Sequence, residues 1–156
     1  MNLKTGDVAP DFSLYDTNKQ LVTLSSLKGQ NVVILFFPFA FTSTCTAELC
    51  SVRDDIASYG KLDARVLGIS VDSPYTLKRY KEDQQLNFDL LSDFNKEVCG
   101  LYGSQYEVFN MGTKGVAKRS AFVIDREGII RYAEVLENAS EIPDLGAVKD
   151  VLSKLG

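Results

Sequence analysis

Apolar residues gather along the chain in short blocks that polar, turn-prone stretches separate. The clearest block is 31–37, Asn-Val-Val-Ile-Leu-Phe-Phe, which is β-branched and aromatic and is closed by Pro38. An almost unbroken apolar run of this length predicts a strand that is buried on both faces. Shorter blocks bounded by turn residues predict further strands. These strands are expected at 12–14, 21–24, 64–71, 88–91, 120–124 and 129–135.

Helical spacing of apolar residues appears between these strands. Residues 42–59 carry apolar side chains roughly on one face, and Pro74 suits the first turn of a second helix that runs to about Gln85. We expect a short helix or turn at 96–102 and an amphipathic helix at 143–155. The resulting order is β-α-β-α followed by β-β-α, which is the order of the thioredoxin fold. We therefore predict one α/β domain over 1–156, with a thioredoxin-like fold and a central mixed β-sheet flanked by helices.

Composition narrows the possible partners. The chain has 156 residues, 45% apolar and 24% charged, and a formal net charge of −4. No basic face is apparent, so we expect no nucleic-acid partner. The longest apolar run, 32–41, is interrupted by Pro38 and is too short to span a membrane, so we expect no membrane partner. Residues 1–10 lack the apolar core of a secretion signal, and we expect a cytoplasmic protein.

The counts of histidine and cysteine limit the chemistry further. The chain contains no histidine, which excludes Cys–His and Ser–His–Asp catalysis and most zinc sites. It contains three cysteines, Cys45, Cys50 and Cys99. An odd number without a secretion signal argues against a disulfide scaffold. Packing, metal binding and redox chemistry remain as their uses.

One cysteine falls where a buried strand gives way to a helix. Thr42 is the expected N-cap of that helix, and Cys45 lies three residues further on, in the first turn. A helix N-terminus carries partial positive charge and unpaired N–H groups, and both stabilise a thiolate. With no histidine available, this dipole and an arginine are the expected means of activating Cys45.

Three separated segments resemble the peroxiredoxin family. Pro38, Thr42 and Cys45 match its active-site pattern Pro-x-x-x-Thr-x-x-Cys, and residues 119–125, in which Arg119 comes just before the strand expected at 120–124, resemble the family's arginine segment. Residues 6–12, Gly-Asp-Val-Ala-Pro-Asp-Phe, resemble the usual peroxiredoxin start and imply the family's N-terminal extension. The sequence around these residues resembles the bacterioferritin-comigratory (Q-type) and AhpE-like branches of the family.

The resemblance implies a thiol-dependent peroxidase that reduces hydrogen peroxide and organic hydroperoxides. The Cys45 thiolate would attack the peroxide and become a sulfenic acid. Arg119 would supply fixed positive charge, the Thr42 hydroxyl would orient the peroxide, and Pro38 would shield the thiolate from water. Neither a cofactor nor a metal is expected. Glu48 lies where the family often has an acidic residue, but it reads as an ordinary helix-surface carboxylate and is left outside the catalytic set.

Cys50 follows Cys45 by five residues, the spacing of a subgroup of the Q-type branch, where it would resolve the sulfenic acid as an intramolecular disulfide. On a helix this spacing turns the side chains about 140° apart and separates the Cα atoms by about 8–9 Å. A disulfide needs about 7 Å or less, so the helix would have to unwind locally. Packing is the other use of Cys50, and the enzyme would then be a one-cysteine peroxiredoxin resolved by an external thiol.

Cys99 is assigned to packing. The family implies a thioredoxin-type reductant, and monomer and homodimer both remain open.

Two other classes of function compete with a peroxidase. A dithiol–disulfide oxidoreductase on the same fold would need a Cys-x-x-Cys pair, which this chain lacks. A non-enzymatic metal-binding module would have to use three thiols without histidine, and Cys-x₄-Cys is not a usual zinc-knuckle spacing. Both alternatives fit the residues less well than a peroxidase.

Overall fold

A computed structural model describes residues 3–155, and its central strand is the apolar run that the sequence singles out. This strand, β3 (Asn31–Phe36), is buried at all six positions. It pairs in parallel with β4 (Ala64–Ser70) and antiparallel with β8 (Arg119–Ile124). The prediction of a strand buried on both faces is confirmed. Residues 1, 2 and 156 of the predicted domain lie outside the described residues.

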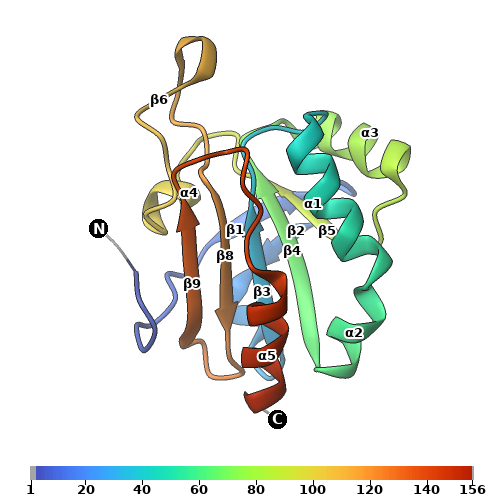
Figure 1. Ribbon diagram of the computed structural model, residues 1–156, viewed down its shortest axis with the longest axis vertical. Coiled ribbons are helices and arrows are strands. Elements are labelled where there is room, and N and C mark those ends of the chain that lie inside the picture. The colour runs from blue at the N-terminus through green and yellow to red at the C-terminus, as the bar shows by residue number, and fades with distance from the viewer. Residues whose placement is uncertain (1–2, 156) are drawn as a thin grey trace.

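The sheet is mixed and, within residues 3–155, has seven strands (Figure 1). Their order is β2 (Leu21–Thr23), β1 (Ser13–Asp16), β5 (Asp89–Ser92), β4, β3, β8 and β9 (Ile130–Leu136). The parallel strands β3, β4 and β5 form the middle, and antiparallel strands flank them on both sides. The N-terminal segment contributes the β1–β2 edge and a 3₁₀ turn, η1 (Leu24–Leu27).

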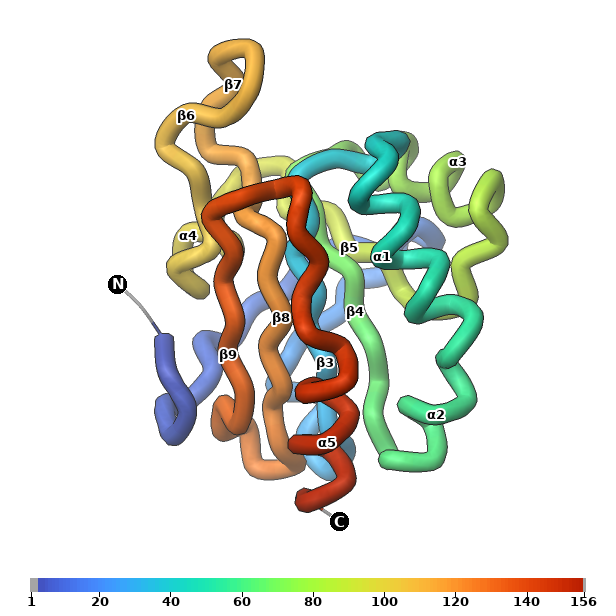
Figure 2. Tube along the Cα trace, viewed as in Figure 1, coloured from blue at the N-terminus to red at the C-terminus, as the bar shows by residue number. Residues whose placement is uncertain are grey.

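Alternate residues of β3 feed two separate apolar clusters. Val33 and Leu35 pack with apolar side chains from α1 (Ser43–Asp54), α3 (Pro74–Gln84) and α5 (Leu145–Leu155). Val32 and Ile34 pack with the N-terminal segment and α4 (Val98–Leu101). Figures 1 and 2 show α5 in front of the sheet and the blue N-terminal segment behind it. The sheet is therefore covered on both faces, as its parallel centre requires.

The helix predicted over 42–59 is in fact two helices. Helix α1 ends at Asp54, and α2 (Ile56–Lys61) begins after Asp55, whose backbone (φ −116°, ψ 15°) departs from helical geometry. The Asp55 carboxylate accepts a hydrogen bond from the Ser58 hydroxyl at 2.6 Å and pairs with the Lys149 ammonium of α5. These two contacts hold the side chain of Asp55 in place at the break between the helices.

A short hairpin that the sequence did not predict projects from one end of the sheet. Strands β6 (Val108–Phe109) and β7 (Thr113–Lys114) pair across the turn η2 (Asn110–Gly112). Figure 1 places this hairpin at the same end of the sheet as the start of α1. Strands of two residues carry no readable alternation, so only the turn residues Asn110 and Gly112 could have signalled it.

The remaining predicted elements are confirmed with ends that shift by one or two residues. No helix within residues 3–155 has both the length and the apolar character needed to cross a membrane.

Candidate active site

The loop from β3 to α1 places Cys45 in the first turn of the helix. Thr42 occupies the N-cap position in extended geometry (φ −101°, ψ 152°), as predicted, and Cys45 is the third residue of α1. The first helical backbone bond at this end runs from the Thr46 N–H to the Thr42 carbonyl at 3.0 Å. The N–H groups before it have no partner one helical turn earlier, so they point their positive ends at the site. The Cys45 side chain is fully buried there.

The Thr42 hydroxyl does not cap the helix. It donates instead to the Phe39 carbonyl at 3.0 Å, and no side-chain cap bond is formed at this end. This bond closes the turn that precedes α1. The helix N–H groups are consequently left for another acceptor, such as an anionic sulfur or a peroxide oxygen.

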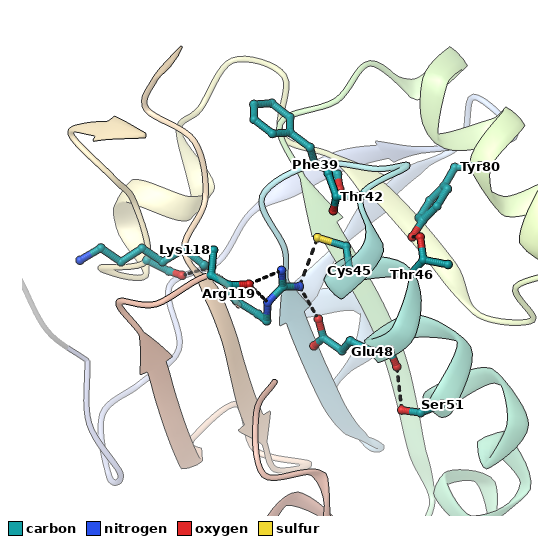
Figure 3. Close-up of polar contacts among 11 residues, drawn as sticks. Phe39, Thr42, Cys45, Thr46, Glu48, Ser51, Tyr80, Lys118 and Arg119 are labelled. Carbon is teal, nitrogen blue, oxygen red and sulfur yellow. Dashed lines mark hydrogen bonds and ion pairs between the residues drawn. The ribbon is translucent and has the colours of Figure 1, made fainter. Parts of the chain in front are cut away.

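Arg119 reaches Cys45 because β8 pairs with β3. Ser120 lies opposite Phe36, the last residue of β3, so β8 begins beside the loop that leads into α1. The Arg119 Nη1 donates to Cys45 Sγ at 3.2 Å (Figure 3). Its Nε and Nη2 donate to the Ala139 carbonyl at 3.2 and 2.9 Å, which fixes the plane of the guanidinium. Arg119 is 1% exposed, so its charge acts on the sulfur with little screening by water.

Glu48 is part of the same cluster, and its assignment to the helix surface is wrong. Its side chain is fully buried, and its Oε1 accepts from Arg119 Nη1 at 2.9 Å. One guanidinium nitrogen therefore bridges the carboxylate and the Cys45 sulfur (Figure 3). The sequence held a signal for this contact, because Glu48 follows Cys45 by three residues and so shares its helix face.

Burial raises the pKa of Glu48 to about 7, against the opposing pull of the Arg119 charge. The second carboxylate oxygen, Oε2, is buried and has no hydrogen-bond partner among residues 3–155. A buried carboxylate oxygen without a donor favours the protonated form of the group. Near neutral pH Glu48 thus changes between two forms. The protonated acid leaves the charge of Arg119 uncompensated, whereas the carboxylate neutralises that charge.

This titration predicts a pH-dependent difference between the wild-type protein and Glu48→Gln. The pKa of Glu48 is raised from its ordinary 4.5 to about 7, so the folded protein binds this proton more tightly than the unfolded chain does. The resulting stabilisation is complete below about pH 4.5 and is lost as the pH rises through about 7. Relative to Glu48→Gln, the wild type should lose about 3 kcal/mol across this window, since one pKa unit is worth about 1.4 kcal/mol.

Urea unfolding of both reduced proteins, from about pH 4.5 to about pH 8, measures this difference. The matched control is Glu127→Gln, because Glu127 is an exposed glutamate in the β8–β9 turn. Its unfolding free energy should follow that of the wild type at every pH. If the Glu48→Gln curve also runs parallel to the wild type, Glu48 does not titrate in this range.

A hollow of about 270 Å³ opens beside Arg119, the residue that contacts the sulfur. Four segments meet around it: the loop and first turn before Cys45, the β6–β7 hairpin, the start of β8, and the chain after β9. Thr42 and Arg119 are among its polar residues, while Pro38, a buried residue, forms part of its lining. The full lining is Pro38, Phe39, Thr42, Ser43, Thr44, Phe109, Asn110, Met111, Arg119, Ala139 and Ser140.

The other two cysteines do not join this cluster. Cys50 is half-buried, and its thiol donates to the Gln84 Oε1 of α3 at 3.5 Å, away from Arg119. Cys99 is buried in the cluster on the opposite face of the sheet, where burial raises its pKa to about 12. Its sulfur lies 3.8 Å from the Gly115 carbonyl. The structure therefore brings Pro38, Thr42, Cys45 and Arg119 together, whereas Cys50 lies further along the same helix, α1, and contacts α3.

The protein combines a thioredoxin-like sheet, a buried thiol at a helix N-terminus and an arginine that contacts this thiol. These features define a cysteine-based redox enzyme that lacks the paired Cys-x-x-Cys of dithiol reductases. Comparison with known proteins gives the family. The model of the AhpC/TSA family matches residues 5–133, and the chain belongs to this family of peroxiredoxins.

Individual relatives agree with this membership. The chain is 42% identical over 154 residues to alkyl hydroperoxide reductase E of Mycobacterium tuberculosis, with 98% of each chain covered. It is 42% identical over 131 residues to peroxiredoxin Bcp of Escherichia coli, covering 83% of this chain and 84% of Bcp. The crystal structure of peroxidoxin BcpB from Mycobacterium tuberculosis superposes with a TM-score of 0.88 at 28% identity, covering 99% of both chains.

A peroxiredoxin-like protein from Aquifex aeolicus superposes with a TM-score of 0.90 at 26% identity, covering 100% of this chain and 90% of the other. The chain therefore has the thioredoxin-like fold of peroxiredoxins and is a thiol-dependent peroxidase, an antioxidant oxidoreductase that acts on peroxide at the expense of a thiol reductant. This assignment replaces the two alternatives, a dithiol–disulfide oxidoreductase and a metal-binding module.

Proposed function

We propose that Cys45 is the thiol that attacks the peroxide, within a single domain whose active site is completed by Thr42, Arg119 and Pro38. The observation that carries the proposal is the 3.2 Å contact from Arg119 Nη1 to the Cys45 sulfur at the start of α1. A buried guanidinium and the helix N-terminus both favour the thiolate, which is the nucleophilic form of cysteine.

In the first step the Cys45 thiolate forms a bond to one peroxide oxygen, and the O–O bond breaks. Cys45 becomes a sulfenic acid, and the departing alkoxide or hydroxide takes up a proton to become an alcohol or water. Negative charge moves from sulfur to oxygen during this step. Arg119 and the free N–H groups at the start of α1 stabilise it at both positions without rearranging. Pro38 has no N–H and keeps water from that side of the sulfur.

The hollow beside Cys45 supports organic hydroperoxides as substrates alongside hydrogen peroxide. Its lining combines polar residues, among them Thr42 and Arg119, with the apolar side chains of Phe39, Phe109 and Met111. A hydroperoxide group would lie beside these polar residues while an alkyl group would lie against the apolar side chains. The name of the mycobacterial relative, alkyl hydroperoxide reductase E, agrees with this preference.

The second step of the proposal is resolution by Cys50. Its thiol attacks the Cys45 sulfenic acid, the S–O bond breaks, and the oxygen leaves as water with the thiol proton. A thioredoxin-type donor then reduces the disulfide by giving two thiol hydrogens and becoming a disulfide itself. The half-buried Cys50, five residues away on the same helix, supports this role. We place the cycle in the cytosol, where such donors are kept reduced.

The mass of the protein after one equivalent of hydrogen peroxide tests the proposal. We expect the reduced protein to lose the mass of two hydrogens, and a tryptic digest without reductant to show this loss within the peptide 29–53, which carries both Cys45 and Cys50. A gain of one oxygen on Cys45 alone would identify a one-cysteine peroxiredoxin that an external thiol resolves. Cys99, which is buried on the other face of the sheet, is the internal control and should stay unmodified. Oxidation at Cys99 before Cys45 would contradict the assignment of the site.

A further inference from the structure

Tyr80 of α3 contacts the chain on both sides of Cys45. Its hydroxyl lies 2.9 Å from Thr46 Oγ1, in the residue that follows Cys45 (Figure 3). Its ring centroid lies 4.9 Å from that of Phe41, in the loop that leads into α1. Tyr80 itself is fully buried. One side chain from another helix thus fixes the loop before the reactive cysteine and the turn after it.

The loop that Tyr80 contacts is in a conformation that its residues do not favour. Phe41 has a φ of 66°, in the left-handed region that is costly for any residue except glycine. Contacts with the rest of the protein must maintain it. The Asp72 carboxylate accepts from the Ala40 N–H at 2.8 Å, and the Tyr80 ring packs on Phe41 from the other side. The start of α1 is therefore held by its neighbours rather than by local preference alone.

The far part of α1 has its own anchors. The Arg53 Nη1 donates to the Gln84 carbonyl at 2.6 Å, and the Asn87 side chain donates to the Arg53 carbonyl at 3.2 Å. Thr46 lies between the two cysteines, on the segment that has to unwind before their sulfurs can meet. Loss of the Thr46–Tyr80 bond would free this segment while Arg53 still held the remainder of the helix.

We propose that Tyr80 is a positioning residue that keeps the first turns of α1 wound and so sets how fast the Cys45 sulfenic acid reaches Cys50. The disulfide step rests on the resolving role proposed above for Cys50. Burial raises the pKa of the Tyr80 hydroxyl to about 12, so this group stays neutral throughout the neutral pH range, and either hydroxyl can donate in the bond to Thr46. Removing the bond should shorten the life of the sulfenic acid, and with it the chance of further oxidation by a second peroxide.

Tyr80→Phe and Thr46→Val each remove this hydrogen bond and nearly preserve side-chain volume. A stopped-flow experiment follows sulfenic acid formation and disulfide formation in the same sample, and the first step serves as the reference for the second. We expect the ratio of the second rate to the first to rise about two- to tenfold in either variant, as the loss of one hydrogen bond implies. The double variant should add little to either single change, because both remove the same interaction.

The matched control is Tyr102→Phe. Tyr102 is equally buried, and its hydroxyl donates to the Pro10 carbonyl at 2.7 Å, but it belongs to the cluster on the other face of the sheet. Its variant should leave the ratio of rates unchanged. An equal rise in Tyr102→Phe would mean that any buried hydrogen bond has the same effect, and it would overturn the inference.

Hydrogen exchange in a Cys50→Ser background separates this inference from the proposed function. No Cys45–Cys50 bond can form there, yet Tyr80→Phe should still speed exchange of the amides at 44–50 about two- to tenfold. The amides of β3 should keep their protection. Unchanged exchange at 44–50 overturns the role of Tyr80, whereas failure of the wild type to form the disulfide overturns only the role of Cys50.

Discussion

Replacing Arg119 with methionine should slow the reaction of Cys45 with hydrogen peroxide by about 10²–10³, the usual effect of losing one charge-stabilising donor from such a site. Methionine replaces the apolar stem of the side chain but removes the charge and all the N–H groups. The contact to Cys45 at 3.2 Å and the contacts to Ala139 are lost together. The sulfur then keeps only the helix N-terminus as a source of positive potential.

The fold should survive this change because Glu48 can take a proton. With Arg119 present, the pKa of Glu48 is already raised to about 7 by burial. Without the arginine, its charge and its hydrogen bond no longer lower this pKa, so the carboxyl group becomes neutral near neutral pH rather than remaining a buried unpaired charge. Circular dichroism and a urea midpoint, measured beside the kinetics, verify that the variant is folded.

Lys118→Met is the matched control for Arg119→Met. Lys118 is the adjacent residue, and its ammonium pairs with Glu137 and lies 5.7 Å from the centre of the Tyr106 ring rather than near the sulfur. Stopped-flow rates for this variant should stay within about threefold of the wild type, which is well under 1 kcal/mol. A change of that small size in Arg119→Met itself would show that the arginine does not act on the reacting atoms.

Cys50→Ser should leave the first step intact and stop the second. Serine keeps the size and the hydrogen-bond donor of the thiol, so the contact with Gln84 at 3.5 Å can be maintained. The sulfenic acid on Cys45 should therefore accumulate after one turnover. Steady-state turnover with a thioredoxin-type donor should fall by about tenfold or more, equivalent to about 1.4 kcal/mol.

Mass spectrometry after increasing doses of peroxide should also show more sulfinic acid on Cys45 in Cys50→Ser than in the wild type, because nothing within the chain removes the sulfenic acid. Cys99→Ala is the control for the loss of a thiol that plays no part in the cycle, and its turnover should match the wild type. If Cys50→Ser turns over at the wild-type rate, Cys50 is structural and an external thiol resolves Cys45.

The local pattern of the sequence was sufficient for the central strand and for the position of Cys45 at the start of a helix. The run at 31–37 could only be buried, and Pro38 had to end it, so the turn and the helix that follows place Cys45 in a first helical turn. The resemblance in the spacing of Pro38, Thr42 and Arg119 was sufficient to identify the family. These features depend on residues close in sequence, or on a pattern that a family repeats.

Tertiary structure alone decided which side chains surround that thiol. Helical spacing places Glu48 on the face of Cys45, but only the pairing of β8 brings Arg119 to it across 71 positions of the chain. Thr46 meets Tyr80 across 34 positions for a similar reason, since α1 and α3 pack on the same face of the sheet. The Thr42 hydroxyl was free to cap the helix or to close the turn, and the geometry of the loop selected the turn. Local sequence thus determines where the thiolate can form, whereas the packing of distant segments determines the charge, shielding and mobility that it experiences.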